Sequence, residues 1–373
     1  MPLSYHDALQ RIQTVVSPVE TRESLPLLNA LNRIATEPIY ASFELPKTAI
    51  SLRDGYALSL KEAPIVDLSL CTRVCTGDAL SEEVDAVIGY EEACVVENAL
   101  HVDKTLPKGW HIKQRGEDIS DEECLVHAFE PLSAYKLTAL AAQGIMKIDV
   151  LKKPRVAIVS IGSGLTSLGE PLVGHALYNS NAISLSARVM DLGCEVCSIQ
   201  TLSDTESLIL QTLDELHHFT DLIITTGALS HNDSIAKLLR EHTFDTVFNE
   251  VAITPAKPSA LSRFHNTFIL HLPGLPLGSL LGFELLGVPL VRALQNHSTL
   301  LPRSYQQMNG ASFTCKACCV SAIPGFSDGK TFVCAPHYEA GRLNALSQCN
   351  GYARIEHQEV VLQGDTVHFI PFT

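Results

Sequence analysis

Two short apolar runs, each ending at a glycine-containing loop, predict the core of this chain. Residues 156–165 read VAIVSIGSGL, and residues 221–230 read DLIITTGALS. Such runs, rich in Ile and Val, are typical of parallel strands that are buried on both faces of a sheet. A stretch with apolar residues near helical spacing follows each run, at 177–192 and at 234–241. The repeated order of strand, loop and helix predicts an α/β domain with a doubly wound, mostly parallel central sheet.

The loops that follow these two strands predict a binding site. In doubly wound sheets, ligands bind beyond the carboxyl ends of the strands, where loop amides and helix N-termini favour an anion. We therefore place the predicted site at residues 160–164 and 227–233. Asp233 directly precedes the second helical stretch and is a plausible cap for its N-terminus.

The remaining pattern predicts β-rich domains on either side of the α/β domain. Short β-like runs separated by turn residues fill an inserted β domain at 51–107 and a C-terminal domain at 299–373, which we expect to be a small barrel or sandwich. Residues 1–50 together with 108–152 form the expected N-terminal and linker domain, and residues 153–298 form the α/β domain. The chain is therefore predicted to be a multi-domain protein of four parts.

The apolar segment 268–291 is long enough to raise the alternative of a membrane span. Pro273, Pro276 and Pro289 are expected to break it. We interpret the Leu-Pro-Gly turn as the boundary between a strand and a buried helix that begins near Leu277. No membrane partner is predicted.

Charge and cysteine content narrow the class of protein further. The 373 residues include 27 basic and 41 acidic residues, and the net charge of −14 argues against a nucleic acid or an anionic membrane as partner. An anionic ligand would need a local basic pocket. The first residues, MPLSYHDALQRI, lack the basic and apolar segments of a signal peptide. Eleven scattered cysteines are typical of reduced thiols, so we expect a cytoplasmic protein.

The cysteine run at 315–319 reads CKACC and raises the question of a zinc site. On a strand, Cys315 and Cys319 would face one side and Cys318 the other, and no second CxxC with zinc spacing follows. We therefore interpret these residues as packed free thiols, with zinc as the alternative. The CEVC segment at 194–197 begins a strand after a helix, unlike a redox-active CxxC.

Segments spread over nearly the whole chain resemble those of one family, and they occur in the family's order. Residues 54–57 read DGYA, and residues 115–118 read RGED within a stretch close to the family's IRRRGEDI. The loop at 221–230, TPAKP at 254–258 and LPGLP at 272–276 have the frames of GGVSxG, KPGKP and LPGNP. Together they resemble the molybdopterin molybdotransferases, the family of MoeA and the gephyrin E-domain.

The chain departs from that family at the loops that face the predicted pocket. The family's TGDEL reads IGSGL here, so Ser163 and Gly164 replace two carboxylates. Thr254 replaces the first Lys of KPGKP, whereas Lys257 retains the second, and Leu275 replaces the Asn of LPGNP. Because Mg²⁺ is held by oxygen ligands that include at least one carboxylate, we expect its binding to be weakened.

The resemblance implies a homodimer that binds adenylylated molybdopterin and molybdate, with Mg²⁺ as cofactor and other proteins of the molybdenum cofactor pathway as partners. It implies an active site that combines the α/β domain of one subunit with the inserted domain of the other. The implied catalytic residues are Asp54, Asp118 and Lys257. The implied substrate-binding residues are Thr76, Arg115, Ser163, Gly227, Ser230, Asp233, Pro273 and Pro276. Asp54, Asp118 and Asp233 are the implied metal ligands, although Asp233 is equally suited to be only a helix cap.

Two functions of different classes follow from the resemblance. The first is a molybdopterin molybdotransferase, which inserts molybdate into adenylylated molybdopterin and releases AMP. The second is a catalytically impaired relative that binds molybdopterin or a partner protein without turnover. The intact DGYA and RGED segments favour the first, and the missing loop carboxylates favour the second.

Overall fold

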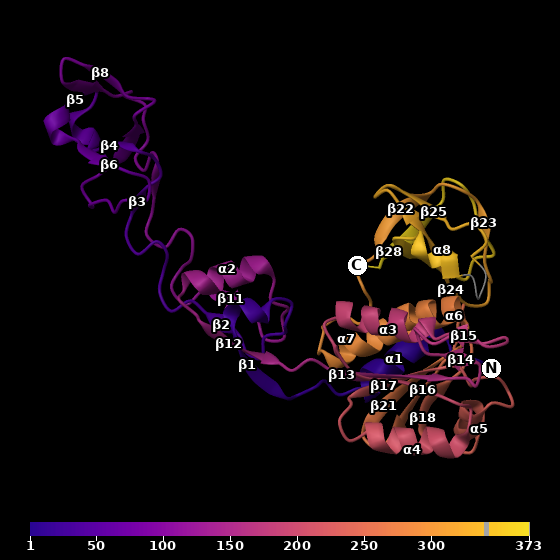
Figure 1. Cartoon of the computed structure of the whole chain (residues 1–373). Helices are drawn as coiled ribbons and strands as arrows, with labels where there is room; N and C mark the ends of the chain where they lie inside the picture. The colour runs from indigo at the N-terminus through magenta and orange to yellow at the C-terminus, as the bar shows by residue number, and fades with distance from the viewer. Residues whose placement is uncertain (339–342, 373) are drawn as a thin grey trace. The chain divides into compact units, whose positions relative to one another are not determined.

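The computed structural model describes residues 1–338 and 343–372, which form two compact units (Figure 1). The first unit comprises Met1–Glu23 and Leu151–Thr373, and the second comprises Ser24–Val150. The predicted N-terminal domain joined all of residues 1–50 to residues 108–152, whereas the structure groups the first 23 residues with the α/β domain. The cause is packing, because helix α1 (Tyr5–Val15) buries one face in the core of that domain. The other predicted boundaries stay predictions.

The first unit is built on a six-stranded sheet with the order β16-β13-β17-β21-β20-β18. The pairings among β16, β13, β17 and β21 are parallel, and β20 pairs antiparallel with both β21 and β18. The predicted mostly parallel sheet is therefore confirmed. The strands are β13 Arg155–Ile161, β16 Glu195–Leu202, β17 Leu222–Thr226, β18 Asp245–Asn249, β20 Ala260–Phe264 and β21 Thr267–Leu272.

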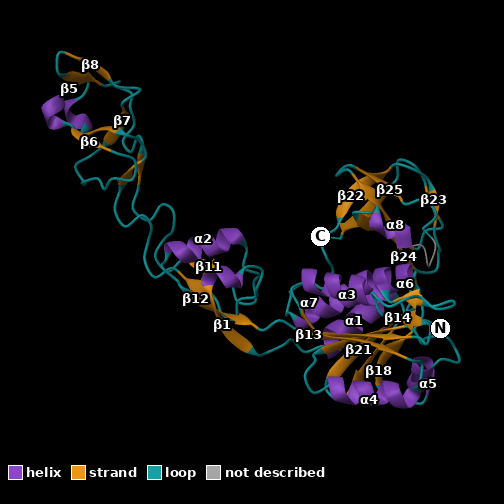
Figure 2. Cartoon of the chain, in the orientation of Figure 1, coloured by secondary structure: helices purple, strands orange, loops and turns teal. Residues whose placement is uncertain are grey.

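Helices cover both faces of this sheet (Figure 2). Helices α1, α3 (Ser180–Asp191) and the long helix that begins at Pro276 share one hydrophobic core with the sheet. Helices α4 (Glu206–Leu216) and α5 (Ser234–Arg240) share the other. Alternate residues of β13 enter the two cores, with Ile158 in the first and Val159 in the second. Burial on both faces explains why this strand is apolar without interruption.

The apolar segment 268–291 divides into β21 and a buried helix, as predicted. The helix passes through α6 (Pro276–Gly282), a π-helical turn (Phe283–Gly287) and α7 (Val288–Leu294). The prediction that Pro289 breaks the segment is wrong, because the helix continues through it. A proline has no N–H to donate, and the π-helical turn before it shifts the hydrogen-bond register there.

This helix, Pro276–Leu294, is long and apolar enough to cross a membrane by length and composition alone. However, 89% of its apolar window is buried inside the structure. Its Glu284 carboxylate is buried as well and accepts two hydrogen bonds from the Arg188 guanidinium of α3, at 2.6 and 3.2 Å. The helix thus has the packing of a core helix, and a buried ion pair fixes it to its neighbour.

The C-terminal part of the first unit is a closed β-barrel. Strand β24 pairs with β25 and β26, β25 pairs with β22, and β28 joins β22 to β26. These pairings close a ring of five strands, so the predicted small barrel is confirmed. The strands are β22 Tyr305–Asn309, β24 Val320–Ser327, β25 Thr331–Cys334, β26 Gly351–Glu356 and β28 Thr366–Pro371.

The second unit contains short paired strands. Its first part pairs β1 with β12 and β2 with β11, and its inserted part forms two three-stranded sheets, β6-β4-β7 and β5-β9-β8. Strands β3 and β10 pair antiparallel where the chain enters and leaves the inserted part. The strands are β1 Arg22–Pro26, β2 Ile39–Tyr40, β3 Ile50–Ser51, β4 Gly55–Leu58, β5 Ile65–Asp67, β6 Thr72–Val74, β7 Ala86–Gly89, β8 Cys94–Val96, β9 Ala99–His101, β10 Ile112–Lys113, β11 Cys124–Val126 and β12 Lys147–Leu151.

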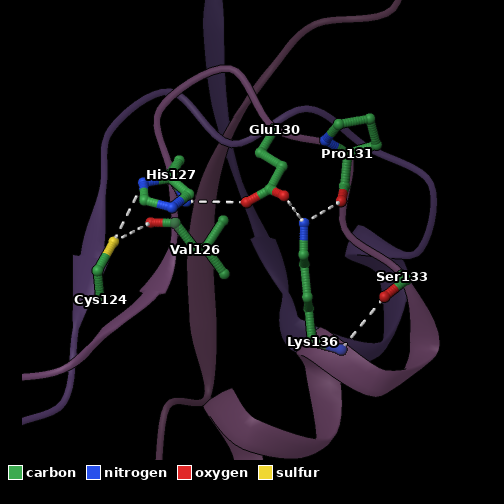
Figure 3. Close-up of polar contacts among 7 residues, drawn as sticks. All are labelled: Cys124, Val126, His127, Glu130, Pro131, Ser133 and Lys136. Atoms are coloured by element: carbon green, nitrogen blue, oxygen red, sulfur yellow. Dashed lines mark hydrogen bonds and ion pairs between the residues drawn. The ribbon is translucent and has the colours of Figure 1, made fainter.

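The turn that leads into α2 (Ala134–Ala142) shows how a helix start is fixed in this unit (Figure 3). The Ser133 hydroxyl caps the helix by accepting a hydrogen bond from the Lys136 amide at 3.3 Å. The Glu130 carboxylate accepts a hydrogen bond from the His127 amide at 3.0 Å and pairs with the Lys136 ammonium. This lysine is the main reason why the pKa of Glu130 lies below its usual value.

Candidate active site at the carboxyl edge of the central sheet

Three loops meet at the carboxyl ends of β13, β17 and β21. The Gly227 amide donates a hydrogen bond to the Leu272 carbonyl at 3.0 Å. Gly227 has φ +92°, and a Cβ there would lie 2.3 Å from the carbonyl oxygen of Ile161. A Cβ at Gly274 would lie 3.3 Å from the Cα of Gly227. Only glycine allows the loops to approach this closely, which gives Gly227 a structural reason beside its predicted role in binding.

The second loop is held by Asp233, one of the predicted site residues. Its carboxylate accepts a hydrogen bond from the Ser230 amide at 2.8 Å, and its own amide donates to the Ser230 carbonyl at 2.9 Å. Asp233 occupies the N-cap position of α5, but its side chain makes no capping hydrogen bond. The Ser234 amide instead donates to the Asp204 carboxylate at 3.2 Å. Asp233 therefore shapes the loop, and the Ser230 side chain is left exposed.

The first loop presents Ser163 to solvent. It is fixed by two backbone hydrogen bonds, from the Gly162 amide to the Leu202 carbonyl and from the Leu177 amide to the Gly164 carbonyl, both 2.9 Å. Ser163 and Gly164 are exposed, and a Cβ at Gly164 would meet nothing within 4 Å. Longer side chains would fit here, so the fold does not enforce the loss of the two carboxylates.

We call TPAKP at residues 254–258 the third motif and LPGLP at residues 272–276 the fourth motif. Lys257 lies in the third motif, in a loop that packs on α6. A Cβ at Gly282 would lie 2.7 Å from the Cβ of Ala256, and a Cβ at Gly278 would lie 3.1 Å from the Cγ of Pro273. Because these positions of α6 are glycines, the third and fourth motifs can both pack closely against the helix. The Lys257 ammonium lies 3.7 Å from the Glu250 carboxylate, and its side chain is 59% exposed. It remains accessible to an anionic ligand.

The other ends of these two motifs are also fixed. The Thr254 hydroxyl lies 3.1 Å from the Cys319 sulfur, and β19 (Ile253–Thr254) pairs with β24 of the barrel. Thr254 therefore joins the third motif to the barrel and does not face open solvent. Pro276 begins α6, where its missing N–H is not needed.

A buried polar network that the sequence analysis missed lies beneath the loops. The Ser160 hydroxyl donates a hydrogen bond to the Asn179 side-chain oxygen at 2.9 Å, and the Asn179 amide group donates to the Thr201 hydroxyl at 2.9 Å. Asn179 also caps α3 by accepting from the Ala182 amide at 3.2 Å. An Asn before a helical stretch is a capping pattern, and that signal could have identified it.

Asn181 was missed as well, and it contacts the loop that follows β21. It is 8% exposed, and its side-chain nitrogen donates to the Gly274 carbonyl at 2.9 Å. Its side-chain oxygen is buried and has no hydrogen-bond partner among the described residues. Since buried polar atoms are normally paired, this oxygen marks where a bound donor would fit.

In the second unit, the structure brings two predicted residues together. The Asp54 carboxylate accepts hydrogen bonds from the Thr76 amide at 2.6 Å and from the Thr76 hydroxyl at 3.0 Å. These hydrogen bonds, the backbone one first, lower the pKa of Asp54. Asp54 is therefore a carboxylate held in one orientation, whichever ligand it meets.

Asp118 and Arg115 lie elsewhere in this unit. The Lys113 ammonium donates to both Asp118 oxygens, at 2.8 and 3.0 Å, and Arg115 pairs with Glu44, which raises the Arg115 pKa. The register pairs β10 with β3, and a bridge joins Leu45 to Ile119. Because antiparallel partners run in opposite directions, Asp118 and Asp54 extend from opposite ends of this ladder. Within one chain they do not form one ligand set, and their predicted roles stay predictions.

Two cysteines of the 315–319 run are at least partly buried, and the third, Cys318, is exposed. Residues 315–319 form a turn between two strands rather than the strand that was predicted. Burial and the neighbouring Cys319 and Cys334 raise the pKa of Cys315 to about 11. Burial likewise raises the pKa of Cys194 to about 12. Raised values are typical of inert buried thiols, so the packing interpretation fits Cys315 and the buried Cys319, whereas Cys318 is exposed.

Comparisons with known protein families show the class to which this protein belongs. A family described as a probable molybdopterin binding domain matches residues 157–293, which contain the central sheet and all three loops. The MoeA N-terminal region, domains I and II, matches residues 3–144. The two matches occur in the order of the motifs, and the chain belongs to the MoeA family.

Relatives and solved structures agree. The chain is 29% identical over 299 residues to the molybdopterin molybdenumtransferase of Haemophilus influenzae, with 74% of each chain covered. It is 28% identical over 322 residues to molybdopterin molybdenumtransferase 2 of Mycobacterium tuberculosis, with 78% of each covered. The molybdopterin biosynthesis moeA protein of Pyrococcus horikoshii OT3 has the same fold, with a TM-score of 0.85 at 21% identity and 99% of each chain covered.

Proposed function

We propose that this chain is a molybdopterin molybdenumtransferase, which inserts molybdate into adenylylated molybdopterin and releases AMP. Its curated relatives bear the name of that transferase over about three quarters of their length. The observation that carries the proposal is the meeting of loops 160–164, 227–233 and 272–276 at one edge of the sheet. The named relatives do not favour the binding-only alternative.

The chemistry of this edge suits an anionic pterin phosphate. The N-termini of α3 and α6 lie at the carboxyl edge, and their free amides favour negative charge. The exposed Lys257 ammonium supplies a charge-assisted hydrogen bond. Cleavage of the adenylate leaves negative charge on phosphate oxygens, which such donors stabilise. The side-chain oxygen of Asn181 is left to orient a donor group of the ligand.

We include Mg²⁺ in this proposal as the ion that would neutralise the phosphate oxygens. Of loops 160–164 and 227–233, only Asp233 carries a carboxylate. Mg²⁺ commonly binds through one or two carboxylates together with substrate phosphates and water. Asp233 therefore suffices as the ligand from these loops. Because Asp54 and Asp118 lie at opposite ends of one strand ladder, either of them, and not both together, is the proposed further ligand from the other subunit of a homodimer.

The proposal also includes the oligomeric state and the location of the protein, which we expect to be a homodimer in the cytoplasm. A composite site joins the retained acidic segments of one subunit to the loops of the other, so sedimentation at micromolar concentration should show a dimer. A monomer at that concentration would remove the composite site. All eleven cysteines are free, which fits the reducing cytoplasm. Other proteins of the molybdenum cofactor pathway are the partners we expect.

The decisive experiment measures molybdate-dependent release of AMP from adenylylated molybdopterin. The natural chain should release AMP, and Lys257→Ala should weaken pterin binding by about ten- to a hundredfold, because a charge-assisted hydrogen bond contributes about 1.5–3 kcal/mol. Lys330→Ala, which removes another exposed lysine of the same unit, is the matched control. Pterin binding without any release of AMP would contradict the proposal.

A further inference from the structure

A second cluster of ligand-type side chains lies at the amino edge of the central sheet, opposite the loops of the proposed active site. It consists of Asp214 and His217 at the end of α4 and His265 in the turn between β20 and β21. Its ligand atoms lie within 4.8 Å of one another. A search of the described residues for three or more Asp, Glu, His or Cys side chains that could hold one metal ion finds this group.

The distances fit a tetrahedral metal after small side-chain adjustments. The Asp214 Oδ1 atom lies 3.6 Å from His217 Nε2 and 3.9 Å from His265 Nε2. A zinc ion bound at about 2.1 Å to each of two such atoms holds them about 3.4 Å apart. The two imidazole rings are stacked, with centroids 4.3 Å apart and an angle of 27° between their planes. The rings therefore already present their Nε2 atoms toward the same carboxylate.

The backbone holds the ligands in place before any ion binds. The His217 amide donates to the Leu213 carbonyl at 3.0 Å, and the His217 carbonyl accepts from the Thr267 hydroxyl at 3.2 Å. His265 has φ +51° in a turn closed by the pairing of Phe264 with Thr267. Asp214 and His217 are three residues apart and so share one face of the helix. Positioned ligands reduce the ordering that metal binding requires.

The charge environment favours a cation here. Asp214 and His217 lie at the C-terminal end of α4, where the helix dipole is negative. A neutral imidazole keeps a lone pair on Nε2 that can bind a metal. The aromatic ring of Phe264 packs edge-on against both imidazoles and shields one side of the cluster.

We propose that Asp214, His217 and His265 bind one divalent transition metal ion, of the class of Zn²⁺ or Co²⁺. Two imidazoles and one carboxylate are ligands that suit these ions, whereas Mg²⁺ prefers oxygen ligands alone. Three protein ligands leave the fourth position to water. The ion joins the end of α4 to the β20–β21 turn, on the side of the domain away from the pterin. The site is independent of the proposed transferase activity.

The test uses the untagged full chain and titrates it with Zn²⁺ and Co²⁺. Isothermal titration should give one site, and bound Co²⁺ should give the visible absorption of a tetrahedral site. His265→Asn keeps a residue that tolerates the left-handed conformation but cannot supply Nε2. It and Asp214→Asn should each weaken zinc binding by about tenfold or more.

His242→Asn is the matched control, because His242 is exposed on the same unit and has φ +56°. It should bind zinc as the natural chain does, and zinc should raise the Tm of both but not that of His265→Asn. Circular dichroism in EDTA confirms that all variants fold alike. Unchanged zinc affinity in both ligand variants would overturn the proposal. A near-ultraviolet cobalt–thiolate band would overturn it too, because it would place the ion on cysteines.

Discussion

The two edges of the central sheet present different chemical groups. At the carboxyl edge, glycines bring three loops together, helix N-termini gather, and Lys257 is the exposed cation of the third motif. At the amino edge, the end of α4 and a tight turn present two imidazoles and a carboxylate. The direction of the helices explains the difference, because N-termini favour anions and C-termini favour cations. One sheet thus has one edge whose backbone groups suit an anion and an opposite edge whose side chains suit a cation.

The largest effect is expected from a substitution that disturbs the backbone at the carboxyl edge and lowers the stability of the protein. Gly227→Ala should destabilise the protein by about 2–4 kcal/mol, because it combines a positive φ with a Cβ placed 2.3 Å from the Ile161 carbonyl oxygen. Urea unfolding measures the change. Gly164→Ala is the control at the same edge, because its Cβ would meet nothing within 4 Å. Equal stability of the two variants would contradict the close approach of the loops.

The next effect concerns the histidine between the two edges. His271 is fully buried in β21, with the Thr225 hydroxyl 2.9 Å from Nδ1 and the Ser262 hydroxyl 2.8 Å from Nε2. Burial lowers its pKa to about 3. An unfolded histidine has a pKa of about 6.5, so between these values the unfolded state binds the extra proton. The stability that neutral His271 contributes is therefore complete above pH 6.5 and is lost as the pH falls.

Between pH 7 and pH 5, this loss should amount to about 2 kcal/mol, at about 1.4 kcal/mol per pH unit below 6.5. His271→Gln should remove this part of the acid sensitivity. The exposed His175→Gln should keep it. Urea unfolding at both pH values measures the difference, and the same loss in both variants would mean that His271 is protonated in the folded state.

A third prediction tests whether added carboxylates at the carboxyl edge strengthen the proposed Mg²⁺ binding. Ser163→Asp combined with Gly164→Glu should lower the Mg²⁺ concentration for half-maximal AMP release by about tenfold, because hard cations bind more tightly to more carboxylates. Both positions are exposed and have room for longer side chains. Gln363→Glu with Thr366→Asp adds the same charge to the barrel as a control. An equal shift in both double variants would point to net charge instead of ligation.

The smallest effect is expected from the cysteine run. Replacing Cys315, Cys318 and Cys319 by Ser should change neither the zinc stoichiometry nor pterin binding, because these thiols pack or lie exposed. Metal analysis beside His265→Asn completes the comparison, since zinc should follow the histidine and not the cysteines. Zinc lost only on the cysteine replacement would reverse this assignment.

Much of the carboxyl edge could be predicted from the sequence because its determinants are local. The apolar runs, the glycines after them and the contiguous motifs lie within a few residues of one another, and the sheet end follows from strand direction. Asn181 was missed because only the fold brings α3 against Gly274. Asp233 was read as a cap or a ligand, and its hydrogen bond to the Ser230 amide depends on the loop conformation.

The sequence by itself determined the fold class, the family and the position of the loops at the carboxyl edge of the sheet, because periodicity and motif order are properties of neighbouring residues. Tertiary structure decided the rest. It continued the helix through Pro289, assigned α1 to the α/β domain and separated Asp54 from Asp118 along one strand ladder. It also brought Asp214 and His217 to His265, about fifty residues away, because α4 ends where the β20–β21 turn begins. No local pattern encodes such a contact, since it depends on how helix and hairpin pack on a shared core.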